Sequence, residues 1–433
     1  MRHEPSTPAS STDKPAPQES AGETRRGPLA WWTRMPLYSR ILIGLVLGIG
    51  VGVVLGPSAK RLELPALLIL RILGGLAPVL ILLAVVQAIM TAEVHGRLAL
   101  RMARLLLLNT VVAIVVGLGV ANVLKPGAGT RLPPPRATNA PVEGNVLSQL
   151  LDNVPDSLVR PFVENKVIGV VMIAVAFGVA ARSLSGSQRK TAEELVGLGF
   201  TCILVVLSWV IALVPLAVFG KVASIIGSSG FAPFAALGLF VGSVLLALVI
   251  QSVYYLTRIR FGSWVRPGQL LRGTRDALVM AFSTASSTVT MPVTYERLRT
   301  RIGLREQSAS LGALVGSNFN NDGTALYEAM AALFIAQMVG VELTIAQQLM
   351  IVITSVIASV GAAGIPEAGL VTMTLVFSAV HLPTEYIALL LTVDWFLDRC
   401  RTMINVLGDM NVACLLDGST RGSPAPVPVQ QET

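Results

Sequence analysis

The stretch VDWFLDRCRTMINVLGDMNVA at residues 393–413 combines a helical period with several charged residues in an apolar setting. At 100° per residue, its polar side chains fall within about 80° of one another on one stripe of a helix. A charged side chain at the centre of a membrane helix costs roughly 2.5 to 3.5 kcal/mol, so the stripe requires partners inside a protein. It consists of Asp394, Asp398, Arg401, Asn405 and Asp409.

Two interpretations of this stripe are open. An internal network of ion pairs would hold a helix bundle together. However, the three acids and Asn405 outnumber what Arg401 can pair, and the surplus leaves oxygen ligands for a cation or an ammonium group. This surplus favours a binding site.

The rest of the chain has the composition of a helical membrane protein. Of its 433 residues, 53% are hydrophobic and 13% are charged, and the mean hydropathy is +0.69. These values exclude an ordinary water-soluble enzyme, and the sequence shows no Ser paired with His or Lys that would suggest a membrane hydrolase. The net charge of +8 comes from basic residues at the edges of apolar runs, so we expect no nucleic-acid partner.

Long apolar runs predict six membrane helices in the first part of the chain. Basic residues crowd the tail before the first run and then alternate links, which predicts a cytoplasmic N-terminus. We expect a multi-pass protein of the cell (inner or plasma) membrane with both termini in the cytoplasm. The first run carries Gly44, Gly48, Gly52 and Gly56, a spacing that predicts close helix packing. The six runs are 41–57, 64–90, 105–124, 167–181, 196–226 and 231–256.

After residue 262 the apolar segments become short and are split by polar, Gly-rich or Pro-bearing clusters. ALVMAFSTASSTVTMPVTYERLR at 277–299 has a Ser/Thr tip, and the segment 343–380 repeats the design with a break at 361–369. Each is followed by a helix with buried polar groups, at 311–338 and 386–416. Paired interrupted segments in corresponding positions predict an inverted-repeat secondary transporter, whose site lies where the breaks meet.

A second polar cluster, SNFNNDGTALYEA at 317–329, lies in the helix predicted over 311–338. Gly323 costs about 1 kcal/mol there relative to Ala, which predicts an unwound stretch. Asn320 and Asp322 could bind a hard monovalent cation through oxygen, and a structural kink is the alternative. For Glu328 two readings stay open, a proton carrier or an ion-pair partner of Arg399.

Four motifs resemble the glutamate transporter family, also called the dicarboxylate/amino acid:cation symporters. They are ASSTVTMP at 285–292, NNDGTALYEA at 320–329, SVGAAGIPEAGLVT at 359–372 and DWFLDRCRTMINVLGD at 394–409. The resemblance covers about 39–417, with some features like those of the animal excitatory amino acid transporters. It implies an all-α membrane protein with eight transmembrane helices, two re-entrant helical hairpins, inverted repeats, elevator motion and a homotrimeric assembly.

The resemblance also divides the chain into a scaffold and a mobile transport domain. It implies a disordered cytoplasmic tail (1–36), scaffold helices 1 and 2 (37–96), transport-domain helix 3 (97–126), an external loop with scaffold helices 4 and 5 (127–228), a transport core (229–417) and a second disordered tail (418–433). The core would contain helix 6, the first hairpin, helix 7, the second hairpin and helix 8.

For the substrate, the resemblance assigns Asp398 to an ammonium group and Arg401 to a side-chain carboxylate. A guanidinium fork suits a carboxylate, and a carboxylate suits an ammonium, so the chemistry agrees. Asn405 and Ser287 would hold the main carboxylate. The pocket would be completed by Ser286, Thr324, Gly364 and Thr402.

For the coupling ions, the resemblance implies one sodium site at Gly316, Asn320, Asn405 and Asp409, and part of another at Asp322 and Thr110. Departures from the family pattern reduce the expected sodium count; they are Leu106, Asn109, Asn318 and Asn321, where the family has Tyr, Thr, Thr and Met. Glu328 and Arg399 match positions linked to proton coupling.

The sequence therefore predicts import of an acidic amino acid (glutamate or aspartate) or a small dicarboxylate, coupled to protons, sodium or both, with no other cofactor. The alternatives are a passive anion channel and a neutral amino acid carrier of the same family.

Overall fold

The structure is a computed structural model that describes residues 35, 37–91, 97–130, 132, 155–164, 167–361 and 368–420. Within these ranges the chain forms helices and turns and no strand, which confirms the all-α prediction. Four helical stretches are long and apolar enough to cross a membrane, as judged by length and composition. They are Ser39–Gln87, Leu100–Leu124, Gly186–Ile211 and Ala232–Gly262.

The first part of the chain begins with α2 (Leu37–Leu55), the 3₁₀ segment η1 (Gly56–Glu63), α3 (Leu64–Thr91) and α4 (Arg97–Leu124). The predicted glycine face of α2 packs against the backbone of a later helix, α9 (Val214–Ser229). A Cβ at Gly44 would lie 2.5 Å from the Pro215 carbonyl oxygen, and Gly48 and Gly52 meet α9 in the same way. Gly56 begins η1 with a φ of +54°, and its carbonyl oxygen would lie 2.1 Å from a Cβ at Gly227 of α9, although its own Cβ position is open.

Between α4 and α9 lie α6 (Arg160–Val163), α7 (Val167–Arg182) and α8 (Gly186–Ile211). The single membrane helix predicted over 196–226 is wrong, because α8 ends at Ile211 and α9 begins at Val214. Pro215 explains the interruption, since its ring lacks an N–H and would clash with the carbonyl group four residues earlier. The next helix, α10 (Ala232–Gly262), is longer than predicted and includes Arg258, which the sequence placed in a link.

The second part of the chain consists of shorter helices followed by one long helix. Its elements are α11 (Pro267–Gly273), α12 (Arg275–Thr284), α13 (Ser287–Arg297), the π segment η2 (Leu298–Ile302), α14 (Glu306–Ala309), the π segment η3 (Ser310–Val315), the 3₁₀ segment η4 (Gly316–Asn318), α15 (Asp322–Val339), α16 (Ile345–Gly361), α17 (Ala368–Ala379), the 3₁₀ segment η5 (Thr384–Tyr386) and α18 (Ile387–Asp417).

Both interrupted segments fold as pairs of helices that pack against each other. We call α12 with α13 the first helix pair and α16 with α17 the second helix pair. At the tip of the first pair, Ala285 has a φ of +51°, and the Ser286 side chain accepts a hydrogen bond from Val289 N. The tip of the second pair, which includes Gly364, lies outside the described residues.

The helix predicted over 311–338 is interrupted, but not where the sequence suggested. The irregular backbone lies at 319–321, between η4 and α15, whereas Gly323 lies in the first turn of α15. Gly323 is needed for close contact, because a Cβ there would lie 2.8 Å from the Arg401 carbonyl oxygen and 3.1 Å from its Cα. The predicted unwinding at Gly323 is therefore wrong by about one turn.

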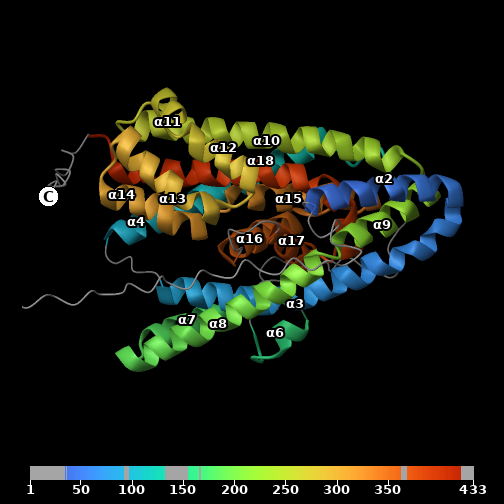
Figure 1. Cartoon of the computed structure of the whole chain (residues 1–433), viewed down its shortest axis with the longest axis horizontal. Coiled ribbons are helices and arrows are strands. Elements are labelled where there is room, and N and C mark those ends of the chain that lie inside the picture. Colours follow the sequence, from blue (N-terminus) through green and yellow to red (C-terminus); the bar gives the residue numbers. More distant parts are fainter. Residues whose placement is uncertain are drawn as a thin grey trace, which may run out of the picture.

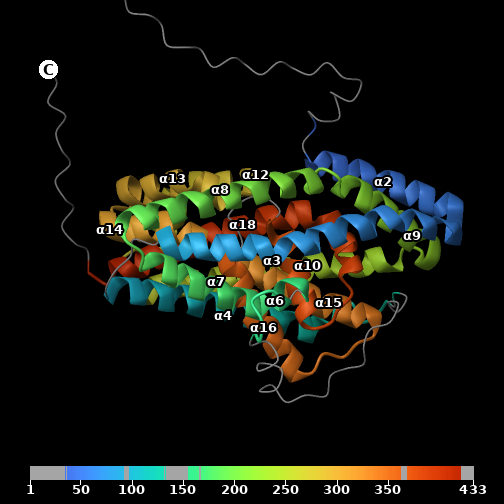
Figure 2. The same ribbon diagram turned by 90° about the horizontal axis from the view of Figure 1, so that it is seen from below.

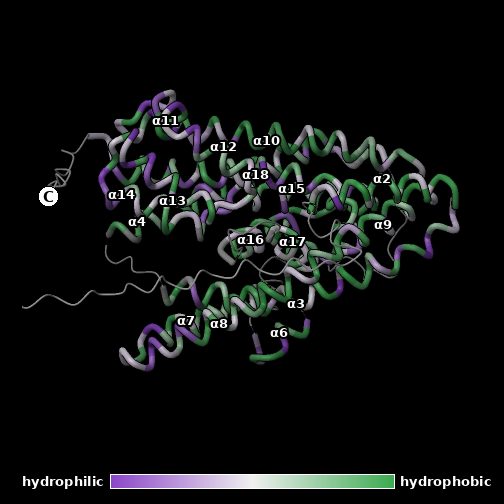
Figure 3. Tube along the Cα trace, viewed as in Figure 1, coloured by the Kyte–Doolittle hydropathy of each residue, from purple (hydrophilic) through white to green (hydrophobic). Residues whose placement is uncertain are grey.

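The predicted C-terminal helix is confirmed as α18, which runs through the interior of the molecule. It packs against α10, α12, α13 and α15 (Figure 1), while α3, α7 and α8 lie on another side (Figure 2). Hydrophilic residues gather at the end that holds α11 and α14, whereas the long helices are mainly hydrophobic (Figure 3). The polar stripe of α18 is thus enclosed by other helices.

Candidate functional site

All five residues of the α18 stripe are buried, as the helical period predicted. The exposed fractions are 3% for Asp394, 8% for Asp398, 0% for Arg401, 4% for Asn405 and 1% for Asp409. Burial of three acids and a guanidinium along one helix is compatible with a membrane only if their charges are compensated locally.

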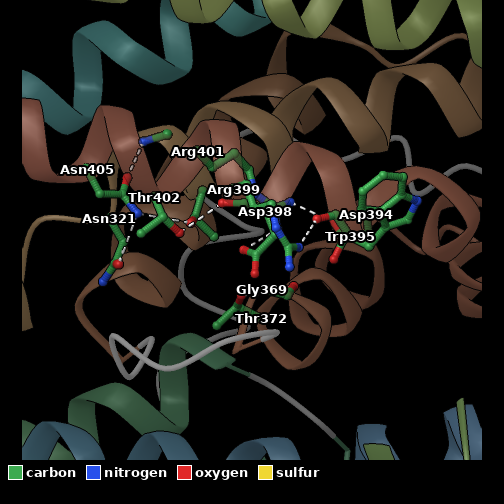
Figure 4. A network of polar contacts seen from close by, with 12 residues as sticks. Asn321, Gly369, Thr372, Asp394, Trp395, Asp398, Arg399, Arg401, Thr402 and Asn405 are labelled. Carbon is green, nitrogen blue, oxygen red and sulfur yellow. Dashed lines mark hydrogen bonds and ion pairs between the residues drawn. The ribbon is translucent and has the colours of Figure 1, made fainter. Parts of the chain in front are cut away.

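Arg401 lies between two acids of its own helix (Figure 4). Its Nη1 donates to Asp394 Oδ1 at 2.9 Å, and its Nη2 donates to Asp398 Oδ1 at 2.8 Å. The guanidinium also lies over the ring of Tyr327, 4.1 Å from the ring centroid. Ion pairs are therefore present among these three residues, but all three belong to α18, so the pairs do not join one helix to another.

The other side of the guanidinium faces the second helix pair. Gly369 of α17 lies so close that a Cβ there would be 3.5 Å from Arg401 Nη2 and 3.3 Å from Thr324 Cγ2. Figure 4 shows Gly369 and Thr372 beside the guanidinium. Arg401 Nε is buried and has no hydrogen-bond partner among the described residues, so a donor remains available here.

Asn405 and Thr402 continue the polar surface toward the break before α15. Asn405 Oδ1 accepts from Gly323 N at 2.8 Å, and its Nδ2 lies 3.5 Å from Thr324 Oγ1. The same Nδ2 lies 3.4 Å from Asn321 Oδ1, and Thr402 Oγ1 donates to the Asp398 carbonyl oxygen. The predicted pocket residues on α15 and α18 are thus brought together.

The tip of the first helix pair lies beside the same break. Ser287 Oγ donates to the Ser317 carbonyl oxygen at 3.4 Å, and both Ser286 and Ser287 are buried. These serines therefore lie near η4. Gly364, the remaining predicted pocket residue, lies outside the described residues.

Polar groups gather around Asp409, and we call Gly316, Asn320, Asn405 and Asp409 the Asp409 cage. Asn320 Nδ2 donates to Asp409 Oδ1 and to the Asn405 carbonyl oxygen, both at 3.0 Å. Gly316 lies against the same carboxylate, with a Cβ position 3.2 Å from Asp409 Oδ1. The four residues that the sequence assigned to one sodium site are therefore neighbours.

The Asp409 cage has the chemistry of a sodium site. Asn320 Oδ1 is buried and has no hydrogen-bond partner within the described ranges, and Asp409 forms no ion pair with a described Lys, Arg or His. A buried carboxylate without a positive partner is costly, and hard monovalent cations prefer oxygen ligands. These residues therefore fit a sodium ion.

The other predicted pair, Thr110 and Asp322, is also in contact. Thr110 Oγ1 donates to Asp322 Oδ1 at 2.6 Å, and the Tyr255 hydroxyl of α10 donates to Asp322 Oδ2. Sequence reasoning missed Tyr255. Its signal was a tyrosine four residues after Gln251 in an apolar run, which places both polar groups on one face of α10.

Glu328 lies on α15 and is completely buried. Thr372 Oγ1 of α17 donates to Glu328 Oε1, while Glu328 Oε2 has no hydrogen-bond partner in the described part of the chain. Arg399 donates to the Trp395 carbonyl oxygen at 2.5 Å and lies over the Trp395 ring, 5.9 Å from its centroid. No ion pair joins Glu328 to Arg399 in the described structure, so that reading of Glu328 does not hold in this conformation.

Comparison of the sequence with known proteins identifies a family and several relatives. A sequence model of the sodium:dicarboxylate symporter family matches residues 37–419. Excitatory amino acid transporter 3 of Mus musculus is 29% identical over 456 residues, covering 91% of this chain and 86% of the relative. The C4-dicarboxylate transport protein of Sphingopyxis alaskensis is 29% identical over 418 residues, covering 93% and 92% of the two chains.

A third relative is more similar over a shorter region. Excitatory amino acid transporter 1 of Homo sapiens is 45% identical over 181 residues, which cover 42% of this chain and 33% of that protein.

Proposed function

The chain belongs to the sodium:dicarboxylate symporter family, and on this premise we propose that it imports acidic amino acids or small dicarboxylates together with sodium, protons or both. It is a secondary symporter of a membrane that its apolar helices cross more than once. The observation that carries the substrate class is Arg401, a fully buried guanidinium at the meeting point of α15, α17 and α18.

The charges around Arg401 explain why cations accompany the substrate. Arg401 pairs with both Asp394 and Asp398, so this group of three carries a net negative charge, and Glu328 and Asp409 are further buried acids without an ion pair to a described base. An acidic substrate adds further negative charge in a region of low dielectric constant, where uncompensated charge is expensive. Loading of the substrate therefore requires sodium or protons to bind with it.

Substrate binding proceeds by exchange of partners at Arg401. Both Nη atoms are paired with acids in the absence of substrate, and Asp398 is the more exposed of those two acids. A substrate carboxylate takes the place of Asp398 at the guanidinium, and a substrate ammonium then pairs with the released Asp398. Asn405, Thr402, Thr324 and the tips with Ser286, Ser287 and Gly364 supply the remaining contacts.

Two sites for coupling ions flank this pocket. Gly316, Asn320, Asn405 and Asp409 would hold a sodium ion, which supplies the positive charge that the buried Asp409 lacks. Glu328 carries a proton, since its second oxygen has no partner among the described residues and its contact with Thr372 links it to the second helix pair. Arg399, on the same helix as Arg401, is the positive group proposed to work with Glu328.

The proposed architecture follows the family resemblance. The two helix pairs are re-entrant hairpins, the other long helices form eight membrane spans with α8 and α9 as parts of one span, and the two termini lie in the cytoplasm. The segments 97–126 and 229–417 form a transport domain that moves like an elevator against a scaffold of 37–96 and 127–228. Three chains assemble into a homotrimer.

Uptake into proteoliposomes tests the substrate class. We expect concentrative uptake of glutamate, aspartate or succinate that requires an inward sodium or proton gradient. Arg401→Ala removes two charge-assisted hydrogen bonds, each worth about 1.5 to 3 kcal/mol, and should lower affinity at least about 100-fold.

Because Arg401→Ala leaves two acids unpaired, the variant needs a folding control. Arg401→Ala combined with Asp398→Asn removes the excess charge, and it should restore the elution profile of the wild-type protein but not the uptake. Wild-type uptake of acidic substrates by either variant would contradict the proposed site.

A further inference from the structure

A buried polar network surrounds Asp322 where α4, α10, α15 and α18 meet, and we call it the Asp322 cluster. Six of its seven residues are at most 4% exposed, and Arg258 is the partly exposed one. The cluster lies next to the Asp409 cage, because Gly408 of α18 leaves room for both Tyr255 Oη and Asn320 Nδ2. Its members are Asn109, Thr110, Gln251, Tyr255, Arg258, Asp322 and Asn411.

The carboxylate of Asp322 is already bound by two hydroxyl groups. Thr110 Oγ1 lies 2.6 Å from Oδ1, and the Tyr255 hydroxyl donates to Oδ2. Thr110 Oγ1 also lies 3.0 Å from the Leu106 carbonyl oxygen, and the Asp322 carboxylate is the nearer of its two acceptors. A metal ion at this carboxylate would have to compete with two hydroxyl donors, whereas in the Asp409 cage the carboxylate accepts one described hydrogen bond, from Asn320 Nδ2, and Asn320 Oδ1 accepts none.

The neighbouring oxygen ligands are also occupied, and one of the donors is a cation. Asn109 Oδ1 accepts a hydrogen bond from Arg258 Nη1, and Asn411 Oδ1 accepts one from Asn109 Nδ2 at 3.3 Å. Arg258 therefore places a full positive charge beside Asn109, the residue that precedes Thr110 in the chain. This charge also attracts Asp322. A second cation at the same place would be repelled.

The register of α10 explains how the guanidinium reaches the cluster. Gln251, Tyr255 and Arg258 are spaced by four and three residues, so they share one face of the helix. That face packs on α4, α15 and α18. Helix α10 therefore carries both Tyr255 and Arg258, and Arg258 is the partly exposed member of the cluster.

We propose that Arg258 is a tethered cation that takes the place of a sodium ion at the Asp322 cluster, so that the chain binds sodium at the Asp409 cage and not at Asp322. The inference rests on the proposed function, because it assigns the mobile sodium ion to the Asp409 cage. It replaces the expectation of a second sodium site at Thr110 and Asp322, whose ligands do not fit one while Arg258 is present.

Sodium binding without substrate tests the inference on the purified full-length chain. The melting temperature is followed as sodium replaces choline at constant ionic strength, since a ligand that binds the folded state stabilises it in proportion to the logarithm of its concentration. We expect sodium to raise the melting temperature of the wild-type protein. This increase should be lost in Asp409→Asn and retained in Asp322→Asn.

The decisive variant is Arg258→Gln, which keeps an amide donor for Asn109 but removes the charge. It should bind a second sodium ion, so its melting temperature should rise with the logarithm of sodium concentration at about twice the wild-type slope. That gain should disappear again when Asp322→Asn is added. Arg258→Lys, which keeps the charge, and Arg260→Gln, which removes an exposed charge beside Phe261, should both retain the wild-type slope.

The possible outcomes separate the two proposals. An Arg258→Gln variant without any gain, or a wild-type response that Asp322→Asn reduces as much as Asp409→Asn does, would overturn the tethered cation. A wild-type chain that ignores sodium, together with an Arg258→Gln variant that gains a response, would support the tethered cation and refute the proposed sodium site at Asp409.

Discussion

Asp394 and Asp398 bind the same guanidinium, but only Asp398 is proposed to meet the substrate. Asp398→Asn should weaken binding of glutamate or aspartate about 10- to 100-fold more than binding of succinate, because only the amino acids carry an ammonium group. Competition binding to purified protein measures this ratio.

Asp394→Asn is the matched control for this ratio. It removes the other acid from Arg401 and should weaken both substrate classes to a similar degree. Equal losses for amino acids and succinate in Asp398→Asn would remove that residue from the ammonium role.

For Glu328 the sequence allowed two roles, a proton carrier or an ion-pair partner of Arg399. With Thr372 as its hydrogen-bond partner and no ion pair to a described base, a carboxyl group here can take up and release a proton during each cycle. We predict that an inward proton gradient drives uptake in sodium-free liposomes, and that Glu328→Gln abolishes this component.

Thr372→Val provides the control for packing at Glu328, because it removes the hydroxyl but keeps the acid. Proton-driven uptake should survive in this variant with altered affinity. Uptake that needs sodium, ignores the proton gradient and persists in Glu328→Gln would establish sodium symport instead.

At the residue level, the helical period predicted the buried stripe, whereas the grouping of Asn320 with Asn405 and Asp409 was expected only from the family resemblance, because Asn320 lies on a different element. The partners of these residues were not predicted. Tyr255 reaches Asp322, and Arg258 reaches Asn109, across helices that are distant in sequence. Such contacts depend on how helices pack, which no local pattern specifies.

At the level of elements, Gly323 sets the distance between α15 and α18. A Cβ at this position would meet the backbone of Arg401, which cannot yield as a flexible side chain would. Gly323→Ala should therefore destabilise the protein by about 1 to 3 kcal/mol and disturb substrate binding. Thermal unfolding in detergent and substrate affinity give the two readouts.

Gly238→Ala on α10 is the matched control, because a Cβ there has open space around it. Helix propensity alone makes this change neutral or stabilising by up to about 1 kcal/mol. If Gly323→Ala behaved in the same way, the close approach of α15 to α18 would not be a constraint.

The sequence located the two helix pairs but misplaced the break before α15. Gly323 suggested unwinding because glycine is a poor helix former, yet its function is close packing. The irregular backbone falls at 319–321, where the side chains of Asn320 and Asn321 donate hydrogen bonds to α18 and α16. Similarly, the length of the apolar run at 196–226 concealed the effect of Pro215, because hydropathy does not report a missing N–H.

At the scale of the whole molecule, a cation–π contact is one of the polar contacts that join the proposed scaffold to the proposed transport core. Lys221 of α9 forms an ion pair with Glu63 of η1, and its Nζ lies 4.4 Å from the centroid of the Tyr386 ring, just before α18. An elevator motion must break the contact between Lys221 and Tyr386, whereas Glu63 and Lys221 belong to the same proposed scaffold.

A reversible cross-link tests this motion. Cysteines at 221 and 386, in a background without Cys202, Cys400 and Cys414, should be bridged by mercury, and the bridge should abolish uptake until a thiol reagent removes it. Cysteines at 63 and 221 form the control pair, whose bridging should leave most uptake intact. Full activity with 221 bridged to 386 would exclude relative movement at this contact.

The pairing of Arg401 within its own helix also bears on how the protein is made. Helix α18 is absent from the four stretches that qualify as spans by composition, and its centre contains Asp394, Asp398, Arg399 and Arg401. Asp398 and Asp394 precede Arg401 by three and seven residues in the same helix. Both ion pairs can therefore form before any other helix is in contact. Helix α18 therefore arrives at the membrane with part of its charge already neutralised, which lowers the energetic barrier to its insertion.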